Sequence, residues 1–414
     1  MQNNTNCTEY YNGHKFISQP SLEQLLVDRD KRIERIELAT ATKKKLLQAK
    51  TREEYESISI PEEYRMFGED AIRIMNSFVS GFAMDIATDC PRCHYGNMES
   101  IVSFTSSTLF RGEIQDFGTT SGYSSLGRTI CREAEGRSAE DRLFSFFVGQ
   151  LRRICFWEFL LNFRQYIEFP YGETLDGLIA QHYGLATSFI DLTDDIKVAL
   201  FFACCIHVGN NQYRPITQKD IAQIGKVGVI YGGQSNLTRI IGFQPFCRCH
   251  RQRGYYIDTA AINPCWEYKL GKEVGFEKCY FDRTVELSEW LYSEFDGGKK
   301  LFPDDGLEPF SEIIAQIACE HSFSFDTFDV ACKVFFKYLE SYRRNNVINN
   351  ECINMFFNKD YLKAKMIGNG FVLCKSKKLK VNEALIEKMN NNWDPDEFAC
   401  KEGFVYSPFI VYVD

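Results

Sequence analysis

The chain has 414 residues, of which 44% are hydrophobic and 25% are charged, and this composition gives ample material for a folded core in roughly two or three domains. A net charge of −8 argues against binding of duplex nucleic acid by the whole surface, because phosphate contacts need a positive face. No apolar run approaches the length of a membrane span, and no charged segment followed by an apolar stretch opens the chain. Because the 16 cysteines show no framework spacing, we expect a cytoplasmic protein in a reducing compartment, without a membrane partner.

The first part of the chain is expected to be helical. Helix-forming residues dominate from Ser21 to Lys50, and a second helix is predicted from Glu62 to Ile86, after the break at Pro61. The segment CPRCH at Cys90–His94 then matches the spacing of covalent haem attachment, but that chemistry needs an export route. A zinc site would need further ligands from Cys247–His250. We therefore expect reduced cysteines in a turn and predict no metal.

The next segment, Ile101–Phe110, alternates in polarity and predicts a strand that ends at Arg111 and Gly112. A guanidinium at a strand end suits bidentate binding of a phosphate or carboxylate, and the glycine lets a ligand approach the backbone. Arg128, in a glycine-rich segment, offers a second cation. The alternative is that Arg111 pairs with Asp191 or with a helix carboxylate and only holds the fold together.

Two helices are predicted before the most informative stretch of the chain. The first spans Leu143–Tyr166 and carries an aromatic stripe that indicates core rather than a cofactor site, formed by Phe144, Phe147, Leu151, Ile154, Phe159 and Phe163. The second ends at His182, with Thr174 as its N-cap and Gly184 as the left-handed residue after it. His182 lies on the apolar face of this helix, which favours a core histidine over a catalytic one.

A strand is predicted from Leu185 to Thr193. An extended conformation places on one face Thr187, Phe189, Asp191 and Thr193. Because unpaired buried polar groups are costly, this face must meet water, a ligand or a polar partner. Asp194 and Asp195 suit the first turn of a following helix, which spans Val198–Cys205 and is apolar all round, hence buried.

Further strands and helices follow. Lys226–Tyr231 alternates as a strand, and a cluster then contains Arg248, Arg251, Gln252, Tyr255 and Tyr256. Arginine, glutamine and tyrosine together suit phosphate binding and base stacking, although a packed strand with a basic edge has the same composition. Near the end, Asp326 is predicted to cap a helix that buries Phe328, Cys332, Phe335, Leu339 and Tyr342.

Several of these segments together resemble one known family. They are LFRGE at Leu109–Glu113, QHYGLATSFIDLT with ALFFA at Gln181–Ala203, RCHRQRGYY at Arg248–Tyr256 and LFPDDGLEPFSEI at Leu301–Ile313. The combination is similar to the FRG-domain family, named for its aromatic, Arg, Gly triplet. The chain departs from the family pattern at Ser188, where the family usually has Arg, at Ala186, where it often has Pro, and at Leu192, where it often has Trp.

The resemblance implies an α+β protein with a mixed or antiparallel core sheet flanked by helices. We expect a helical N-terminal extension over residues 1–98, the FRG domain over 99–313 and a mostly helical C-terminal extension over 314–414. Because the family is associated mainly with bacteria, phages and mobile elements, the resemblance also implies a role in anti-phage defence or as a toxin.

A more distant resemblance is to ADP-ribosyltransferases, in which an arginine and a strand of hydroxyl residues hold NAD. It implies NAD as the substrate. Cleavage of the glycosidic bond develops positive charge that a nearby carboxylate can stabilise. Asp191, Glu267 and Glu277 are candidates for this carboxylate, and no position is assigned to a catalytic glutamate.

The expected site combines three catalytic residues with a nucleotide-binding set. The catalytic residues are Arg111, Thr187 and Asp191, and the binding set is Arg111, Gly112, Arg128, His182, Tyr183, Ser188, Thr193, Arg248 and Gln252. Arg111 is expected to hold an anion, and Asp191 to orient Arg111 or a ribose hydroxyl. The expected partners are a nucleotide-type small molecule and a macromolecular target. The alternative function is a non-catalytic module that recognises a nucleotide, a nucleic acid or a protein through the same pocket.

Overall fold

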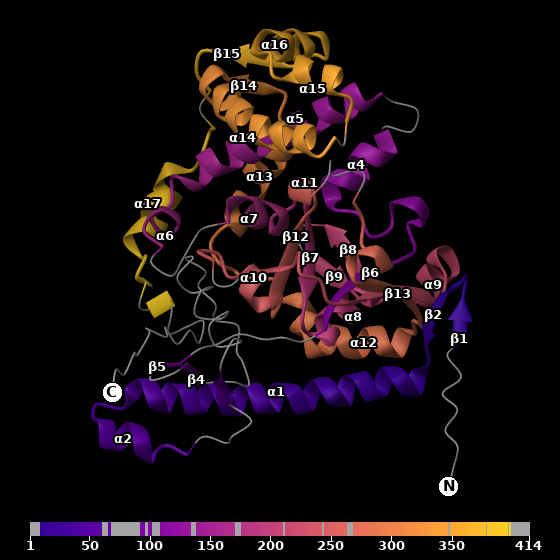
Figure 1. Cartoon of the computed structure of the whole chain (residues 1–414), viewed down its shortest axis with the longest axis vertical. Helices are drawn as coiled ribbons and strands as arrows, with labels where there is room; N and C mark the ends of the chain where they lie inside the picture. The colour runs from indigo at the N-terminus through magenta and orange to yellow at the C-terminus, as the bar shows by residue number, and fades with distance from the viewer. Residues whose placement is uncertain are drawn as a thin grey trace.

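The computed structural model describes residues 9–59, 65–67, 92–95, 98–101 and 108–398, apart from 134–137, 170–174, 210–211, 242–243, 263–267, 347, 378 and 396 (Figure 1). The strands are β1 (Glu9–Tyr11), β2 (His14–Ile17), β3 (Arg65–Phe67), β4 (Arg92–Tyr95), β5 (Met98–Ile101), β6 (Leu109–Glu113), β7 (Phe189–Thr193), β8 (Ile206–Gly209), β9 (Gln212–Arg214), β10 (Val227–Gly233), β11 (Arg239–Ile240), β12 (Gly254–Asp258), β13 (Phe276–Asp282), β14 (Ser322–Ser324) and β15 (Val372–Cys374). The α-helices are α1 (Gln19–Gln48), α2 (Arg52–Ser57), α4 (Ser125–Glu133), α5 (Ala139–Leu160), α6 (Arg164–Ile167), α7 (Asp176–His182), α8 (Ile196–Cys204), α9 (Gln218–Ile224), α10 (Arg248–Arg251), α11 (Thr259–Ile262), α12 (Val285–Glu294), α13 (Ser311–Ala318), α14 (Phe325–Arg344), α15 (Asn350–Phe356), α16 (Lys359–Gly368) and α17 (Glu383–Asn391).

The centre of the molecule is one eight-stranded sheet. Its order is β1-β2-β13-β10-β6-β7-β12-β11, so β6 and β7, which carry the FRG triplet and the polar strand motif, lie side by side near the middle. The pairing is antiparallel except between β2 and β13, which run parallel. The expected α+β class with a mixed sheet is therefore confirmed. The N-terminal strands β1 and β2 belong to this sheet as well.

Helix α8 packs against β6 and β10 on one face of the sheet, as its uniformly apolar sequence predicts. All its residues except Phe202 are buried. The helix begins after Asp195, whose carboxylate accepts a hydrogen bond from the Lys197 N–H at 2.9 Å, so this aspartate is the N-cap. The outer side of this layer is formed by α12 and by the long helix α1, which runs along the bottom of Figure 1.

A buried group of charges joins α1 to the sheet. The Asp194 side chain is fully buried and accepts hydrogen bonds from Arg253 at 2.5 and 2.9 Å and from Arg32 of α1 at 2.8 Å. Arg29, also on α1, bonds to both carboxylate oxygens of Asp195. The two acidic residues between β7 and α8 therefore fix the N-terminal helix onto the body of the protein.

The C-terminal helices form a second core with α5. The aromatic stripe of α5 is buried against α14, where the rings of Phe147 and Phe335 lie 5.1 Å apart, and the predicted core role of both helices is confirmed. Figure 1 shows these helices above the sheet, together with α15, α16 and the small sheet of β14 and β15. Helix α5 also contacts α7, so it connects the C-terminal helices to the sheet.

Several local predictions were wrong. The strand at the FRG triplet begins at Leu109 and runs to Glu113, so the triplet lies inside the strand rather than at its end. Arg65–Phe67, expected in a helix, is a strand paired with β4. Helix α14 is capped by Ser324, whose hydroxyl accepts from the Thr327 N–H, and not by Asp326. The remainder of the helix expected at Glu62–Ile86, the Thr174 cap and Cys90 lie outside the described residues.

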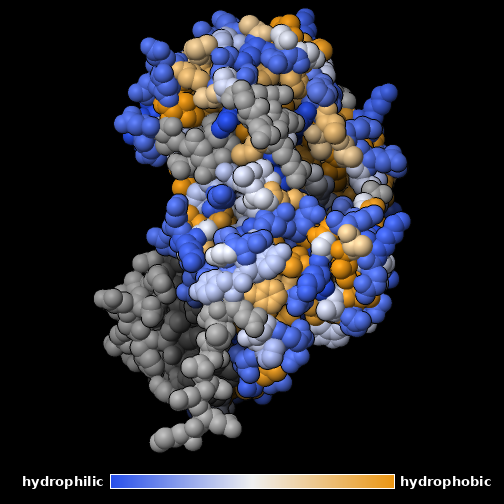
Figure 2. Space-filling model, turned by 90° about the vertical axis from the view of Figure 1, so that its right-hand side faces the viewer, coloured by the Kyte–Doolittle hydropathy of each residue, from blue (hydrophilic) through white to orange (hydrophobic). Residues whose placement is uncertain are grey.

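Among the described helices, none has both the length and the apolar character needed to cross a membrane. Hydrophilic side chains cover much of the face in Figure 2, and smaller hydrophobic groups lie scattered between them.

Candidate functional site

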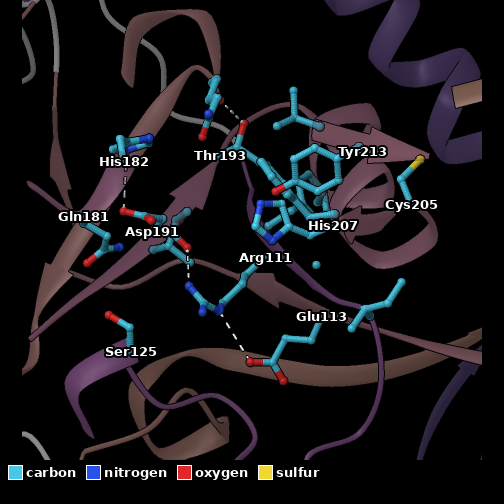
Figure 3. A pocket seen from close by; sticks show the side chains of 18 of the residues that line it. Arg111, Glu113, Ser125, Gln181, His182, Asp191, Thr193, Cys205, His207 and Tyr213 are labelled. Carbon is cyan, nitrogen blue, oxygen red and sulfur yellow. Dashed lines mark hydrogen bonds and ion pairs between the residues drawn. The ribbon is translucent and has the colours of Figure 1, made fainter. Parts of the chain in front are cut away.

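The candidate site lies where β6 and β7 separate. The two strands pair only at Phe110 and Thr193, whereas each forms five residue pairs with its other neighbour, β10 or β12. Beyond this single pair, the space beside Arg111 and Asp191 opens into a pocket of about 690 Å³ (Figure 3). This volume lies within the range of roughly 300–1,000 Å³ that is usual for small-molecule sites.

Four charged or ionisable side chains form a row along one side of the pocket (Figure 3). His182 Nε2 lies 3.8 Å from Asp191 Oδ1. Arg111 donates a hydrogen bond to the Asp191 backbone carbonyl at 3.1 Å, and its Nε lies 3.6 Å from Glu113 Oε1. The Arg111 guanidinium therefore bonds to the backbone carbonyl of Asp191 and not to its carboxylate. The Asp191 side chain is 35% exposed and faces the pocket.

Glu113 is held firmly by the loop after β6. Its carboxylate accepts from the Ser121 hydroxyl at 2.6 Å and from the Gly122 N–H at 3.1 Å, and the residue is buried. Because both oxygens are engaged by the protein, Glu113 positions this loop and Arg111.

His182 is neutral in this environment. Burial lowers the pKa of its imidazole, and the nearby guanidinium of Arg248 lowers it further, against the opposing effect of Asp191. A neutral imidazole nitrogen donates or accepts one hydrogen bond according to its tautomer.

Aromatic side chains line the other side of the pocket. They are Phe202, His207, Tyr213 and Phe302, and they come from α8, β8, β9 and the loop after α12. The rings of Tyr213 and Phe302 are stacked with their centroids 5.2 Å apart, and His207 lies 5.1 Å from Tyr213. Partial burial lowers the pKa of His207. The pocket therefore offers charged groups on one side and flat apolar surfaces on the other.

The structure brings most of the sequence-predicted site residues to this pocket. Those that line it are Arg111, Gly112, Arg128, His182, Asp191, Thr193 and Gln252. Two of them bond mainly to the protein: the Thr193 hydroxyl donates to the Gln252 carbonyl at 2.8 Å, and the Gln252 amide donates to the Leu301 carbonyl at 3.1 Å. Arg128 has its guanidinium carbon 4.8 Å from the centroid of the Phe117 ring, which also lines the pocket.

The structure explains the glycine at position 112 by helix packing, and not by the approach of a ligand as we expected. A Cβ at this position would lie 1.8 Å from the Ala199 carbonyl oxygen and 3.0 Å from the Ala203 backbone nitrogen. The glycine therefore admits the backbone of α8 to β6, and its expected role in the approach of a ligand to the backbone receives no support from this geometry.

Thr187 and Ser188 do not line the pocket, because β7 begins only at Phe189 and the residues before it are buried against other elements. The Thr187 hydroxyl bonds to the Gln181 side chain. The Ser188 hydroxyl donates to Asp258 at 3.0 Å, on the side of the C-terminal helices.

Tyr183 and Arg248 are likewise outside the pocket lining and form a buried cluster behind His182. The guanidinium carbon of Arg248 lies 3.8 Å from the Tyr183 ring centroid, and Arg248 bonds to Glu308 and to the His182 carbonyl. The Tyr183 hydroxyl bonds to Asp305. Both side chains therefore serve the fold, and Glu308 and Asp305 of the LFPDDGLEPFSEI segment are their partners.

Sequence reasoning did not select several pocket residues. These are Glu113, Ser125, Gln181, Cys205, His207, Tyr213 and Phe302. Gln181 and Glu113 belong to two of the quoted segments, QHYGLATSFIDLT and LFRGE, and the period-two pattern of a strand would place Glu113 on the same face as Arg111. His207, Tyr213 and Phe302 come from segments without a motif, so only the tertiary fold brings them to the site.

Of the three carboxylates considered for catalysis, Asp191 lines the pocket. Glu277 lies on β13 with its side chain 41% exposed and its nearest ion-pair partner Lys272 at 3.8 Å, and Glu267 lies outside the described residues. Within the described part of the chain, no group of three or more His, Cys, Asp or Glu side chains has metal-binding geometry.

Arg111 also connects the two separating strands, and this contact predicts a stability effect. Replacing Arg111 by alanine should lower the free energy of unfolding by about 1–3 kcal/mol, because the Asp191 carbonyl loses a charged hydrogen-bond donor and Glu113 loses a cation. Urea unfolding followed by circular dichroism measures this change. Arg239→Ala is the control, since Arg239 bonds only to nearby exposed carbonyls. Equal stability of Arg111→Ala and wild type would exclude a role of Arg111 in holding the strands.

Comparison with family models matches residues 106–212 to the FRG domain. This range contains β6, the central stretch Gln181–Ala203 and α8, so the resemblance to the FRG-domain family inferred from the motifs is confirmed over these residues. Searches of curated proteins and of solved structures found no match to the chain.

Proposed function

We propose, for a chain that contains an FRG domain, that the pocket between β6 and β7 binds a nucleotide of the NAD class. The observation that carries the proposal is that Arg111 and Asp191 line the same pocket as the stacked rings of Tyr213 and Phe302. Figure 3 shows Arg111, Asp191 and Tyr213 in this pocket. A guanidinium suits a diphosphate, and aromatic rings suit a base. Arg128, which also lines the pocket, supplies a further positive charge for the same anion.

The reaction that this arrangement supports is cleavage of the bond between nicotinamide and ribose. As that bond breaks, its electron pair goes to the nicotinamide nitrogen and positive charge develops on the ribose. Asp191, the carboxylate that faces the pocket, stabilises this charge electrostatically. The ADP-ribosyl group then forms a bond to a nucleophile of a macromolecular target or to water, and the nucleophile releases its proton to solvent.

A role in anti-phage defence or as a toxin fits consumption of host NAD or modification of a host macromolecule.

One observation favours a second candidate, a non-catalytic recognition module. Arg111 bonds to the Asp191 carbonyl and lies beside Glu113, so it already has protein partners before any ligand binds. Such a module would bind the nucleotide without changing it.

Mass spectrometry of nicotinamide released from NAD by the full chain tests the enzymatic proposal. Wild type should release nicotinamide, and Asp191→Asn should reduce the rate by roughly 100-fold or more, as loss of one electrostatic stabiliser does. Asp282→Asn is the matched control, because Asp282 lies on β13 with its side chain 50% exposed and pairs only distantly with Lys226. Binding of NAD without release of nicotinamide would favour the recognition module. An unchanged rate in Asp191→Asn would remove Asp191 from the mechanism.

A further inference from the structure

Three buried polar atoms of residues that line the pocket have no hydrogen-bond partner: Arg111 Nε, His182 Nε2 and Asp191 Oδ1. Arg111 Nε lies 3.6 Å from Glu113 Oε1, whereas His182 Nε2 and Asp191 Oδ1 lie 3.8 Å apart, too far for a hydrogen bond to each other. The His182 side chain is only 4% exposed. Buried polar atoms in folded proteins are almost always satisfied by protein, water or ligand, so an unsatisfied pair in a pocket indicates the place of a bound polar group.

The chemistry of the two atoms limits what this group can be. A carboxylate oxygen only accepts hydrogen bonds, whereas a neutral imidazole nitrogen donates or accepts. A hydroxyl accepts a hydrogen bond from His182 Nε2–H and donates one to the Asp191 carboxylate, so it satisfies both atoms when the imidazole proton is on Nε2. A cation is disfavoured, because Arg111 already bonds to the Asp191 carbonyl and Arg248 to the His182 carbonyl, which places two guanidinium groups beside the pair.

We propose that His182 and Asp191 together bind one ribose hydroxyl of the nucleotide, so that the pocket selects ribonucleotides over their deoxy analogues. This inference rests on the proposed nucleotide function and specifies its substrate class. A site that hydrogen-bonds a substrate hydroxyl rejects the analogue that lacks it, since the buried polar groups of the protein are then left unpaired. The selectivity comes from two side chains on different elements, the end of α7 and the middle of β7.

Calorimetric titration of the full chain with NAD and with NAD analogues that lack a 2′- or a 3′-hydroxyl on either ribose tests this inference. At least one analogue should bind about 10- to 100-fold more weakly than NAD. For each protein, the affinity for NAD is compared with the affinity of the same protein for the deoxy analogue. This ratio does not depend on the fraction of protein that is folded.

Variants of His182 and Asp191 test whether these two side chains cause the selectivity for NAD over its deoxy analogue. In Asp191→Ala and in His182→Leu the ratio should fall to near 1, since neither variant retains the full pair. His182→Gln keeps an amide that donates and accepts, so it should restore part of the ratio. Asp282→Ala, a carboxylate removed outside the pocket, should retain the wild-type ratio.

The outcomes separate this inference from the proposed function. Equal binding of NAD and all the deoxy analogues by wild type overturns the hydroxyl site but leaves nucleotide binding intact. Wild-type selectivity that persists in Asp191→Ala and His182→Leu overturns the assignment to this pair. Absence of NAD binding by wild type overturns the proposed function and this inference with it.

Discussion

Asp194→Asn should lower the free energy of unfolding by about 3–5 kcal/mol, the usual effect of removing one partner from a buried ion pair. The Asp194 side chain is fully buried and bonds to Arg253 and Arg32, and the Tyr255 hydroxyl lies 3.4 Å from it. An amide of the same shape removes the carboxylate charge that these two guanidinium groups share. Urea unfolding measures the change, and Asp282→Asn, a half-exposed aspartate on β13, should change stability by no more than about 0.5 kcal/mol. A small effect of Asp194→Asn would mean that α1 is not held by this cluster.

The same carboxylate predicts a pH dependence. Burial by itself raises the pKa of Asp194, but the guanidinium groups of Arg253 and Arg32 outweigh it and hold the pKa below its ordinary value of 3.8. A depressed pKa in the folded state gives stabilisation that is complete above the unfolded pKa and is lost as the pH falls through the folded value. The stability difference between wild type and Asp194→Asn should therefore be constant at neutral pH and shrink below about pH 4.

Gly112→Ala should destabilise the protein by about 3 kcal/mol or more. The added Cβ would lie 1.8 Å from the Ala199 carbonyl oxygen and 2.8 Å from the carbonyl carbon, so α8 must move away from β6. These contacts are backbone atoms of a buried helix, which cannot rotate aside as a flexible side chain does. Urea unfolding, with the midpoint compared at equal slope, measures the loss.

Gly232→Ala provides the matched control for this substitution. Gly232 lies on β10, in the same sheet, and pairs with Phe110 of β6. The atoms nearest to a Cβ added at Gly232 would be ring carbons of Phe110 at 3.6 Å, an ordinary contact distance. Its stability should stay within about 1 kcal/mol of wild type. If Gly112→Ala retained wild-type stability but lost nucleotide binding, the glycine would serve the ligand, as the sequence alone had indicated, and not the packing of α8.

The buried helices could be predicted from the sequence because the apolar pattern that identifies each of them lies within one continuous segment. The stripes of α5 and α14 repeat at helical spacing, and α8 has too many apolar residues for any other place than the core. Gly184 takes the left-handed conformation, with φ of 96°, that its position after His182 indicated. Each of these features is decided by residues within a few positions of one another.

The site was only partly predictable because its two sides come from distant segments. Arg111 and Asp191 were found through motifs, but Tyr213 and Phe302 reach the pocket only through the packing of β9 and the loop after α12. Arg248 shows the opposite error, since a cluster of arginine and tyrosine in sequence suggested a ligand site, whereas Glu308 and Tyr183 enclose this arginine in the fold. Which charge pairs with protein and which remains for a ligand depends on tertiary contacts.

The most direct test of nucleotide binding at the β6 and β7 pocket is calorimetric titration of NAD into the full chain, with Arg111→Ala, confirmed to be folded, titrated in parallel. We expect saturable binding at one site per chain in wild type, and an affinity at least about tenfold weaker in the variant because the anion-binding guanidinium is lost. Absence of binding to wild type, or equal affinity in both proteins, would contradict this expectation.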